Sequence, residues 1–340
     1  MKIKCMKTLF VLGLVSALTL FAACKEETGG SVVIYSPHSE EQVTAILGLF
    51  EKESGIKVDL ISVGIGEVFK RLKSEINNPY ADVAWGGVSS IYVENQDLFE
   101  SYVSVNDDKF PEQFRNHSGK VTFFCLDGSL LIYNTNLLGS VKIEGYADLL
   151  NPALKDKIIM ADPAASGSAF AHLINMLCAM GDGDYMSDKG WGYVQALLVN
   201  NDGKIAGSSS MVPKSVADGE YGVGISNEDN SINYVKNGAP VKIVYMKEGV
   251  HFNAGSMAVV KGTKNLENAK KFVDFITSKQ AQDIYGSQTT VRPIRADAQT
   301  SEYMTALKEI RILPKDEDYI NQHRQEILDR YKTLVTEVRN

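Results

Sequence analysis

The sequence predicts an α/β protein of two lobes with a ligand cleft between them. Three observations carry this prediction: candidate strands and helices alternate in two successive series, each series covers about 100 residues, and small residues fill the turns after the strands. Strands that are joined through helices pair in parallel, because a hairpin turn connects only antiparallel strands. Ligands of open α/β sheets bind beyond the carboxyl ends of the strands. The turns after the strands are therefore the candidate site.

The composition excludes several classes of protein. The chain has 340 residues, a formal net charge of −7 and 23% charged residues, which suits two globular lobes of ordinary size. No run of Lys or Arg forms a basic stripe, so no nucleic-acid partner is expected. No apolar run reaches the roughly eighteen residues of a membrane span. The sequence has no Gly-x-Ser-x-Gly, His-Glu-x-x-His or Walker motif, and the protein is predicted not to be an enzyme.

Residues 1–23 have the pattern of a secretory signal peptide, in which lysines come first, an apolar run follows and two alanines precede Cys24. The junction resembles a bacterial lipobox, which implies cleavage before Cys24 and diacylation of its thiol. The alternative is a plain signal peptide, cut nearby, with an incidental cysteine. Residues 24–30 then form a polar, lipidated tether. The protein is predicted to be exported and lipid-anchored to the membrane, facing the periplasm or the cell exterior.

The first strand and helix follow the tether. Residues 31–35 are predicted to form a short buried strand. Ser39 and Gln42 have the spacing of a capping box that begins a helix, and Gly55 ends that helix. One face of this helix is apolar and is made by Val43, Ile46, Leu47 and Phe50.

Two more strands complete the first series, over residues 56–63 and 82–85. A helix between them begins at the turn 64–67, and its inward residues are predicted to be Phe69, Leu72 and Ile76. The order strand, helix, strand, helix, strand predicts a parallel sheet with crossovers. The candidate site residues at the carboxyl ends of these strands are Ser36, His38, Gly66, Glu67 and Gly87.

The second series begins with a strand over residues 158–161. The turn Ser166-Gly167-Ser168 comes next and opens an apolar helix that runs to Met180. A helix is predicted around Trp191 and another before Ala217. Further strands are predicted over 223–225, 241–245 and 256–260, a helix over 266–276, and one long amphipathic helix over 318–338.

The chain is predicted to cross between the lobes near 126–131 and to return near 246–252. The first lobe then comprises 31–128 and 247–300, the second lobe comprises 129–246, and helices in 301–340 pack on the lobes. Cys125 lies in an apolar stretch and Cys178 lies on an apolar helix. Nothing local favours their pairing, so both are predicted to be free thiols, with a disulfide as the alternative.

Five segments, in this order along the chain, resemble a known family of transport proteins. The family comprises the substrate-binding components of ATP-driven (ABC) importers, specifically the ferric-ion-binding-protein-like group, which includes binders of iron(III), hexose phosphate, phosphonate, thiamine and polyamine. The resemblance implies a two-lobed periplasmic-binding-protein type II fold with a hinge and an interlobe cleft. It also implies a small-molecule or ion ligand, with a membrane permease and its ATPase as partners. The segments are Val33–Glu40, Phe50–Val58, Ala81–Gly87, Ala161–Ala169 and Val216–Gly224.

The turn Ser166-Gly167-Ser168 is the candidate anion site. Unpaired N–H groups and the helix dipole favour an anion at a helix N-terminus, and in the family the matching turn holds phosphate. Ser209 and Ser210 stand at a similar junction. The alternative for these serines is simple helix capping. With this anion site the resemblance favours a phosphorylated sugar or an organophosphonate as ligand, with no cofactor and no metal.

Two ligand classes lead on the resemblance, and thiamine, a polyamine or another ligand stays open behind them. Iron-binding members carry an adjacent tyrosine pair after the strand that matches 223–225, whereas this chain reads Ser226-Asn227-Glu228-Asp229 there. Glu228 is therefore the candidate acceptor for hydroxyl or amino groups of a phosphorylated ligand, or else an acid that only opens a helix. The alternative is Fe(III) with a synergistic anion. Its ligands would be His38, Glu67, Glu228 and Tyr234.

Overall fold

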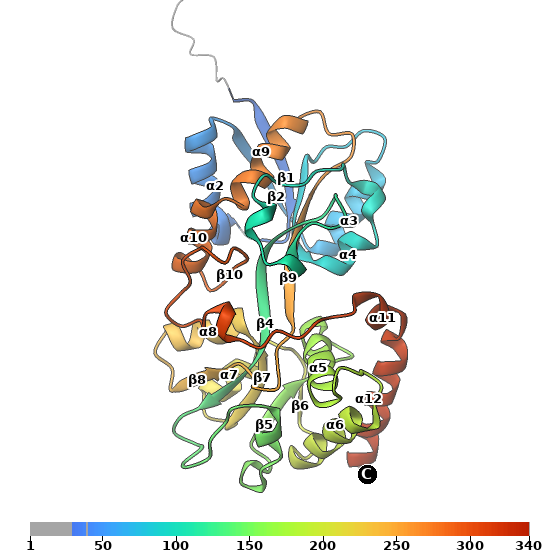
Figure 1. Ribbon diagram of the computed structural model, residues 1–340, viewed down its shortest axis with the longest axis vertical. Coiled ribbons are helices and arrows are strands. Elements are labelled where there is room, and N and C mark those ends of the chain that lie inside the picture. The colour runs from blue at the N-terminus through green and yellow to red at the C-terminus, as the bar shows by residue number, and fades with distance from the viewer. Residues whose placement is uncertain (1–28, 39, 340) are drawn as a thin grey trace, which may run out of the picture.

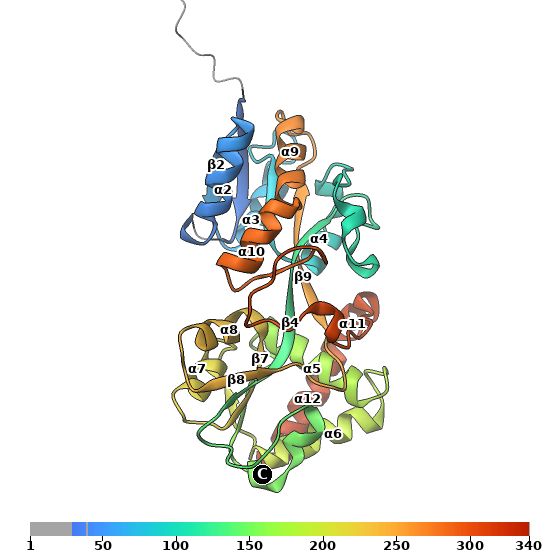
Figure 2. The ribbon, with the colours of Figure 1, turned by 60° about the vertical axis from the view of Figure 1, so that its left-hand side comes forward.

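The computed structural model describes residues 29–38 and 40–339. The predicted signal peptide, the lipidation site Cys24 and the capping residue Ser39 lie outside the described residues. The described chain forms two α/β lobes, one above the other in Figure 1, and the turned view in Figure 2 shows the strands β4 and β9 running between them. The predicted two-lobed α/β fold is confirmed.

One curled sheet of ten strands runs through both lobes. Its order is β2-β1-β3-β9-β4-β7-β5-β6, and β8 and β10 also pair with β4. The strands are β1 Ser31–Ser36, β2 Lys57–Ser62, β3 Val83–Val88, β4 Thr122–Asn134, β5 Ile158–Ala161, β6 Ile205–Ala206, β7 Val223–Asn227, β8 Val241–Val244, β9 Phe252–Val259 and β10 Arg292–Pro293.

The parallel crossovers of both series are present. β1 pairs in parallel with β2 and with β3, and β5 pairs in parallel with β6 and with β7. The carboxyl ends of β1 and β3 therefore lie side by side at the edge of the first lobe that faces the second lobe (Figure 1). This geometry follows from the helical connections, because each helix returns the chain to the starting edge of the sheet.

The long strand β4 belongs to both lobes. Its residues 122–128 pair with β9 in the first lobe, and its residues 129–133 pair with β7 in the second. The chain changes lobe at Gly128, where a Cβ atom would lie 2.6 Å from the ring of Phe252. A glycine at this position therefore lets the two crossing strands β4 and β9 approach each other closely.

Helices cover the sheet in each lobe. The first lobe carries α2 Glu40–Ser54, α3 Ile65–Ser74, α4 Ser89–Val93, α9 Leu266–Ile276 and α10 Lys279–Gln288. The second lobe carries α5 Gly167–Met180, α6 Asp188–Asn200, α7 Met211–Ala217, α8 Glu228–Lys236, α11 Glu317–Gln322 and α12 Arg324–Arg339. Short 3-10 turns occupy Gln96–Leu98, Asp107–Lys109, Glu112–Phe114, Tyr146–Leu150, Pro152–Leu154 and Leu307–Glu309.

Two helix predictions need correction. Ile76, predicted to face inward, is 55% exposed because α3 ends at Ser74, before the next inward position. The predicted tail helix is two helices, which meet at His323. Phe69 and Leu72 are buried on α3 as predicted.

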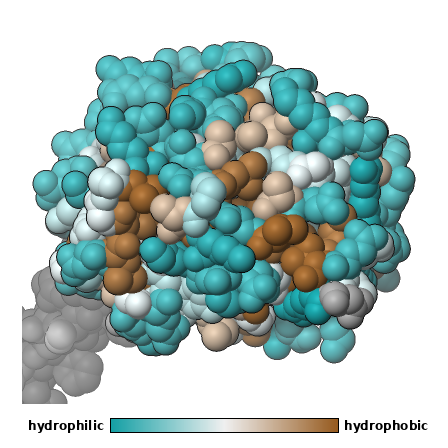
Figure 3. All heavy atoms as spheres, turned by 90° about the horizontal axis from the view of Figure 1, so that it is seen from below, coloured by the Kyte–Doolittle hydropathy of each residue, from teal (hydrophilic) through white to brown (hydrophobic). Residues whose placement is uncertain are grey.

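Each lobe has its own apolar core. In the first lobe the ring centroid of Phe272 lies 5.3 Å from that of Phe50 and 5.4 Å from that of Trp85, which joins α2, α9 and β3. In the second lobe α12 packs on α6 and buries Ile327 and Tyr331. The far end of this lobe is mostly hydrophilic, with its apolar side chains in separate small groups (Figure 3).

Cys125 and Cys178 are both free thiols, as predicted. Among the described helices, none is both long enough and apolar enough to cross a membrane.

Candidate functional site

The cleft between the lobes has two wings. The α5 wing, about 500 Å³, lies between α4 in the first lobe and α5 and α11 in the second. The α8 wing, about 630 Å³, lies between α2 and α10 in the first lobe and α8 in the second. Four residues line both wings, so the wings adjoin there. They are His38 after β1 and Phe124, Cys125 and Asp127 on β4.

His38 faces the cleft at the end of β1, and Ser36 orients its ring. The Oγ atom of Ser36 lies 2.9 Å from Nδ1 of His38 and accepts a hydrogen bond from the His38 backbone N–H at 3.1 Å. The ring packs against Trp85 at 4.9 Å and Phe124 at 6.0 Å between centroids. Burial lowers the pKa of His38 to about 4, so the imidazole is neutral at pH 7. With Nδ1 engaged, Nε2 is the ring nitrogen left for a ligand.

Two glycines at the end of β3 make room for this histidine. Gly86 and Gly87 have φ angles of 109° and 86°, in the left-handed region that favours glycine. A Cβ atom on Gly86 would lie 2.8 Å from Cε1 of His38. Gly87 lines the α5 wing beside Ser89 and Ser90.

The predicted anion turn lies at the N-terminus of α5. Ser166 caps this helix, because its Oγ accepts a hydrogen bond from the N–H of Ala169 at 3.3 Å, and its backbone carbonyl accepts from Phe170. Gly167 and Ser168 line the α5 wing. Their N–H groups are in the first turn, where no carbonyl of the helix itself accepts them. These two N–H groups are therefore available to an anion in the cleft.

The other predicted serines have local partners. The Oγ of Ser209 lies 2.5 Å from the Oγ of Ser166, and the Oγ of Ser210 lies 3.0 Å from that of Ser208. Neither Ser209 nor Ser210 lines a wing. The structure therefore gives Ser209 a supporting position behind the cap of α5.

The structure does not bring Gly66 and Glu67 into the cleft. Both stand in the first turn of α3, and the carboxylate of Glu67 forms ion pairs with Arg71 at 3.1 Å and Lys70 at 3.6 Å on the helix surface. The hydrogen bond from Arg71 is the main cause that lowers the pKa of Glu67. Its neighbour Ile65, rather than Glu67, contacts the cleft turn at Gly87.

Glu228, another predicted ligand residue, does not lie at the cleft surface either. Its carboxylate forms a bidentate ion pair with Arg292, and each of these side chains is 1% exposed. The hydroxyl of Tyr245 donates a further hydrogen bond to the same carboxylate. With its oxygens engaged, Glu228 is not placed to accept hydrogen bonds from a ligand. Tyr234 packs on an apolar cluster of the second lobe and lines neither wing.

Asp127 lines the cleft together with Glu94 and Glu317, and it was not among the residues predicted from the sequence. Its Oδ2 accepts a hydrogen bond from Asn227 at 2.8 Å and its Oδ1 accepts one from the N–H of Asp229 at 3.3 Å. Burial and the neighbouring carboxylate of Asp229 raise the pKa of Asp127 to about 7. The sequence did contain a sign that Asp127 is special, because Asp127 and Gly128 interrupt an otherwise mostly apolar run from Val121 to Tyr133.

The chain's tail adds two cations to the α5 wing. Arg324, the first residue of α12, stacks on Phe170 with its Cζ 3.9 Å from the ring centroid. Lys315 donates a hydrogen bond to Asn253 on β9 at 2.8 Å and forms an ion pair with Glu317. Sequence pattern offered no means of locating these residues, because the tail reaches the cleft only through its packing on the second lobe.

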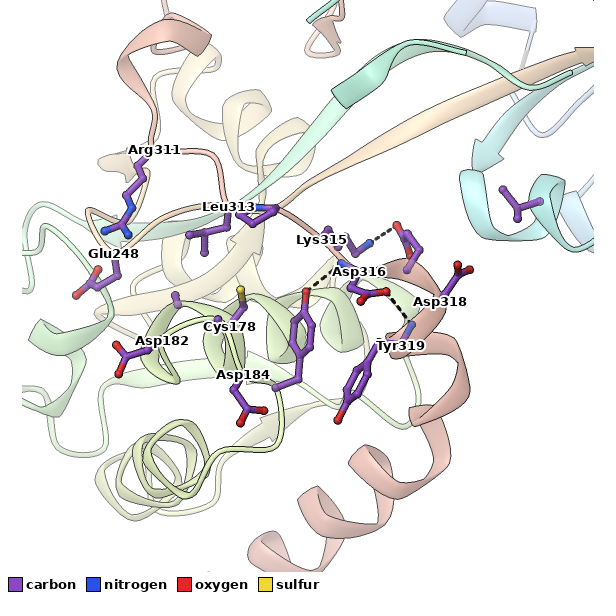
Figure 4. Close-up of a pocket in the computed structure, with 16 residues that line it drawn as sticks. Cys178, Asp182, Asp184, Glu248, Arg311, Leu313, Lys315, Asp316, Asp318 and Tyr319 are labelled. Carbon is purple, nitrogen blue, oxygen red and sulfur yellow. Dashed lines mark hydrogen bonds and ion pairs between the residues drawn. The ribbon is translucent and has the colours of Figure 1, made fainter. Parts of the chain in front are cut away.

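A larger hollow in the described chain adjoins the α5 wing at Lys315 and Glu317, which line both. It measures about 1190 Å³ and lies on the second lobe, between the turn 182–185 and the segment 311–319 (Figure 4). Six acids line it and only two basic residues do, so it does not suit an anionic ligand. The acids are Asp182, Asp184, Glu248, Asp316, Glu317 and Asp318.

Two lobes, strands that cross between them and polar groups from both lobes around one cleft define a binding protein. Residues 45–311 match the family described as "Bacterial extracellular solute-binding protein", and the chain belongs to this family.

Three relatives illustrate the range of the similarity. The periplasmic binding protein AfuA from Actinobacillus pleuropneumoniae, solved with exogenous fructose-6-phosphate bound, is 26% identical, with a TM-score of 0.69 over 90% of this chain and 99% of that one. A putative 2-aminoethylphosphonate-binding periplasmic protein of Salmonella typhimurium is 25% identical over 74% of each chain. Ferric iron-Binding Protein A of Mannheimia haemolytica, in an open conformation, shares the fold at 18% identity, with a TM-score of 0.73 over 92% of this chain and 99% of that one.

These comparisons confirm the predicted class, a solute-binding protein of ABC importers. The family is a transport family of extracellular or periplasmic proteins. The resemblance to the ferric-ion-binding-protein-like group is confirmed as well.

Proposed function

We propose that this protein captures a phosphorylated sugar or an organophosphonate in its interlobe cleft and delivers it to a membrane permease driven by an ATPase. One observation carries the proposal: the N–H groups that begin α5, the neutral imidazole of His38 and the carboxylate of Asp127 line the same cleft. The N–H groups of α5 suit a phosphoryl group, and His38 and Asp127 suit the polar remainder of the ligand. The relatives named for fructose-6-phosphate and 2-aminoethylphosphonate have ligands of this chemistry.

The phosphoryl group would bind in the α5 wing. Gly167 and Ser168 offer N–H groups at the positive end of a helix of 14 residues, and Arg324 adds a cation that has no carboxylate partner among the described side chains. Each charge-assisted hydrogen bond contributes roughly 1.5–3 kcal/mol. Three or four of them support about micromolar binding after the costs of association.

Capture would proceed by hinge closure. The first lobe contributes His38 and Gly87 to the α5 wing, and the second lobe contributes Gly167 and Ser168. A ligand that contacts both sets binds the closed arrangement better than the open one, and so shifts the population toward closure. Diacylation at Cys24 would hold the protein at the membrane, next to the permease.

Ferric iron is the less favoured ligand. Of the four residues predicted to bind it, only His38 lines the cleft, because Glu67, Glu228 and Tyr234 lie elsewhere. Among the side chains that the structure describes, no three His, Cys, Asp or Glu gather in a metal-binding group. The phosphorylated ligand requires no such group.

A thermal-shift screen of the purified chain tests the ligand class. The panel contains glucose-6-phosphate, fructose-6-phosphate, 2-aminoethylphosphonate, thiamine, spermidine, and ferric citrate with phosphate. A ligand at 1,000 times its dissociation constant stabilises the fold by about 4 kcal/mol. We expect a shift with phosphorylated or phosphonate compounds. A shift with ferric citrate alone would contradict the proposal.

A proline at the start of α5 tests where the anion binds. Gly167→Pro removes one N–H group, and proline is well tolerated at the first position of a helix, after a residue as extended as Ser166. We expect the variant to unfold like the wild type and to bind the phosphorylated ligand about tenfold more weakly. Gly167→Ala retains the N–H group, has no atom within 4 Å of its new Cβ, and should bind normally. Equal affinity in both variants would place the anion elsewhere.

A further inference from the structure

We propose that the two lobes close on the α5 side of the cleft only, because the buried ion pair between Glu228 and Arg292 fixes the α8 side as the pivot. Hinge closure is part of the proposed function, and this inference rests on it and adds its direction. The helices α8 and α10 lie on one side of the crossing strands β4 and β9, and α4, α5 and α11 lie on the other (Figure 1 and Figure 2). The two sides of the cleft can therefore move by different amounts.

The ion pair joins one lobe to the other. Arg292 belongs to β10, which pairs with residues 125–126 of β4 in the first lobe. Glu228 begins α8 in the second lobe. The Nε atom of Arg292 lies 3.0 and 2.9 Å from the two carboxylate oxygens of Glu228, and each side chain is 1% exposed. The pair is therefore a buried contact between the lobes and not a contact within one of them.

Further contacts surround the pair on the same side. The Cζ atom of Arg292 lies 5.6 Å from the ring centroid of Tyr245 and 5.5 Å from that of Phe252, and Nη2 donates to the Tyr245 hydroxyl at 3.1 Å. Next to the pair, the hydroxyl of Thr290 in the first lobe donates to the carboxylate of Asp229 on α8. Opening this side would break these contacts together, and it would leave the guanidinium without its carboxylate partner, which is costly.

The α5 side has no comparable contact. The side-chain hydrogen bonds in and just after α4 stay within the first lobe, since Tyr92 donates to the carbonyl of Gly86 and Asn95 donates to that of Ile91. In the part of the chain that the structure describes, no hydrogen bond or ion pair joins α4 to α5, α11 or α12. The α5 side is thus free to change its width while the α8 side is held.

Exposed apolar side chains indicate the surface onto which α4 closes. Val88 and Val93 stand at the two ends of α4 and are 55% and 45% exposed. Val88 lines the α5 wing together with Ile320 and Arg324, and Val93 lines the hollow of Figure 4 together with residues 313–319. Burial of apolar surface is favourable, so closure of α4 onto α11 and the start of α12 would be stabilised by both valines.

Closure in this direction defines the walls that a captured ligand meets. Ser89 and Ser90 of α4 line the α5 wing on the side of the first lobe, and Gly167 and Ser168 of α5 line it on the side of the second. The movement brings the first wall toward the second, so that α4 covers a ligand held by the N–H groups of α5. The α8 wing keeps its width.

Two pairs of nitroxide spin labels measure the movement on each side, by double electron–electron resonance on the full chain with its other cysteines replaced by serine. Asp97→Cys with Gln322→Cys spans the α5 side, and Lys236→Cys with Gln288→Cys spans the α8 side. All four positions are exposed. In the protein without ligand we expect a broad distance distribution for the α5 pair and a narrow one for the α8 pair.

Fructose-6-phosphate and 2-aminoethylphosphonate are then added. We expect the compound that binds to shorten the α5 distance by more than about 2 Å and to leave the α8 distance unchanged. Equal shortening on both sides, binding without a change on the α5 side, or an α8 distribution as broad as the α5 one would overturn this inference and leave phosphoryl capture intact. If neither compound binds, the proposed function fails, and the distributions without ligand still decide which side moves.

Removal of the ion pair tests the pivot itself. Glu228→Leu with Arg292→Met replaces the buried charges by apolar side chains and should broaden the α8 distribution. The same replacements at an exposed pair, Glu67→Leu with Arg71→Met, should leave both distributions unchanged. If the first variant fails to fold, Thr290→Val removes the neighbouring contact without a change of charge and should also broaden the α8 distribution. An α8 distribution that stays narrow in the folded variant would assign the pivot to the crossing strands and overturn the role of the ion pair.

Discussion

Glu228 and Arg292 form an ion pair inside the protein. Because of this contact, Glu228 cannot act as a hydrogen-bond acceptor for a ligand in the cleft, whereas Asp127 lines the cleft. Arg292 donates to both carboxylate oxygens and also to the carbonyl of Thr305. The position of Glu228 after a strand suggested a ligand acceptor, as the position of His38 did. Only His38 has a side chain at the cleft. The difference could not be predicted, because Arg292 lies 64 residues further along the chain and no local pattern links it to Glu228.

Loss of one member of this pair should destabilise the fold strongly. Glu228→Ala leaves the Arg292 guanidinium buried without its anion, and we expect the free energy of unfolding to fall by about 3–5 kcal/mol. Urea denaturation measures the change. Glu67→Ala breaks an exposed ion pair and should leave stability nearly unchanged. The double variant Glu228→Leu with Arg292→Met should recover most of the loss. A single variant as stable as the wild type would show that the pair is not a buried constraint.

At the scale of elements, the sequence correctly predicted the helices and strands that depend only on nearby residues. Periodicity and turn residues predict the helix α5 and the strands β1, β3 and β5. They also predict that β1 pairs in parallel with β3, and β5 with β7. The strand β4 was foreseen only as a crossing point, because its partners β7 and β9 lie about a hundred residues away and its apolar run lacks alternation. The break of the tail at His323 escaped for a similar reason, since its apolar spacing continues across the break.

The end of β3 should tolerate no side chain at Gly86. Gly86→Ala places a methyl group at a φ of 109° and 2.8 Å from His38, so we expect a loss of about 1–2 kcal/mol in stability and weaker ligand binding. Thermal unfolding and calorimetry measure the two effects. Gly48→Ala, in the middle of α2 with nothing within 4 Å of the new Cβ, should instead stabilise the protein by about 0.5–1 kcal/mol. Full binding by Gly86→Ala would mean that this turn does not position His38.

At the scale of the whole molecule, the cleft depends on packing between parts that are distant in sequence. The first lobe combines the N-terminal series with the returning strand β9, and the second lobe is completed by the tail helices α11 and α12. The residues at strand ends could therefore be predicted from the sequence, whereas Asp127 on the crossing strand and Arg324 on the tail could not.

The buried titratable groups together set how the stability of the whole molecule depends on pH. His38, His172 and His251 are buried and have pKa values lowered to about 4, so the unfolded chain binds more protons than the folded one as the pH falls from 6.5 toward 4. Each histidine thus makes the protein less stable in acid. Asp127 opposes them, because its raised pKa of about 7 lets the folded state hold a proton that the unfolded state releases until about pH 4.

These opposing contributions give a net loss of about 2 kcal/mol per pH unit near pH 5, measurable as the free energy of unfolding in urea at several pH values. Removal of Asp127 removes the opposing contribution. We therefore expect Asp127→Asn to be relatively more stable near pH 8 and to lose stability more steeply near pH 5, by about 1 kcal/mol more per pH unit than the wild type. The steeper slope is the diagnostic result, because a variant that is merely less well packed would lose the same free energy at every pH. A slope equal to that of the wild type would show that Asp127 is already ionised in the folded protein at pH 5.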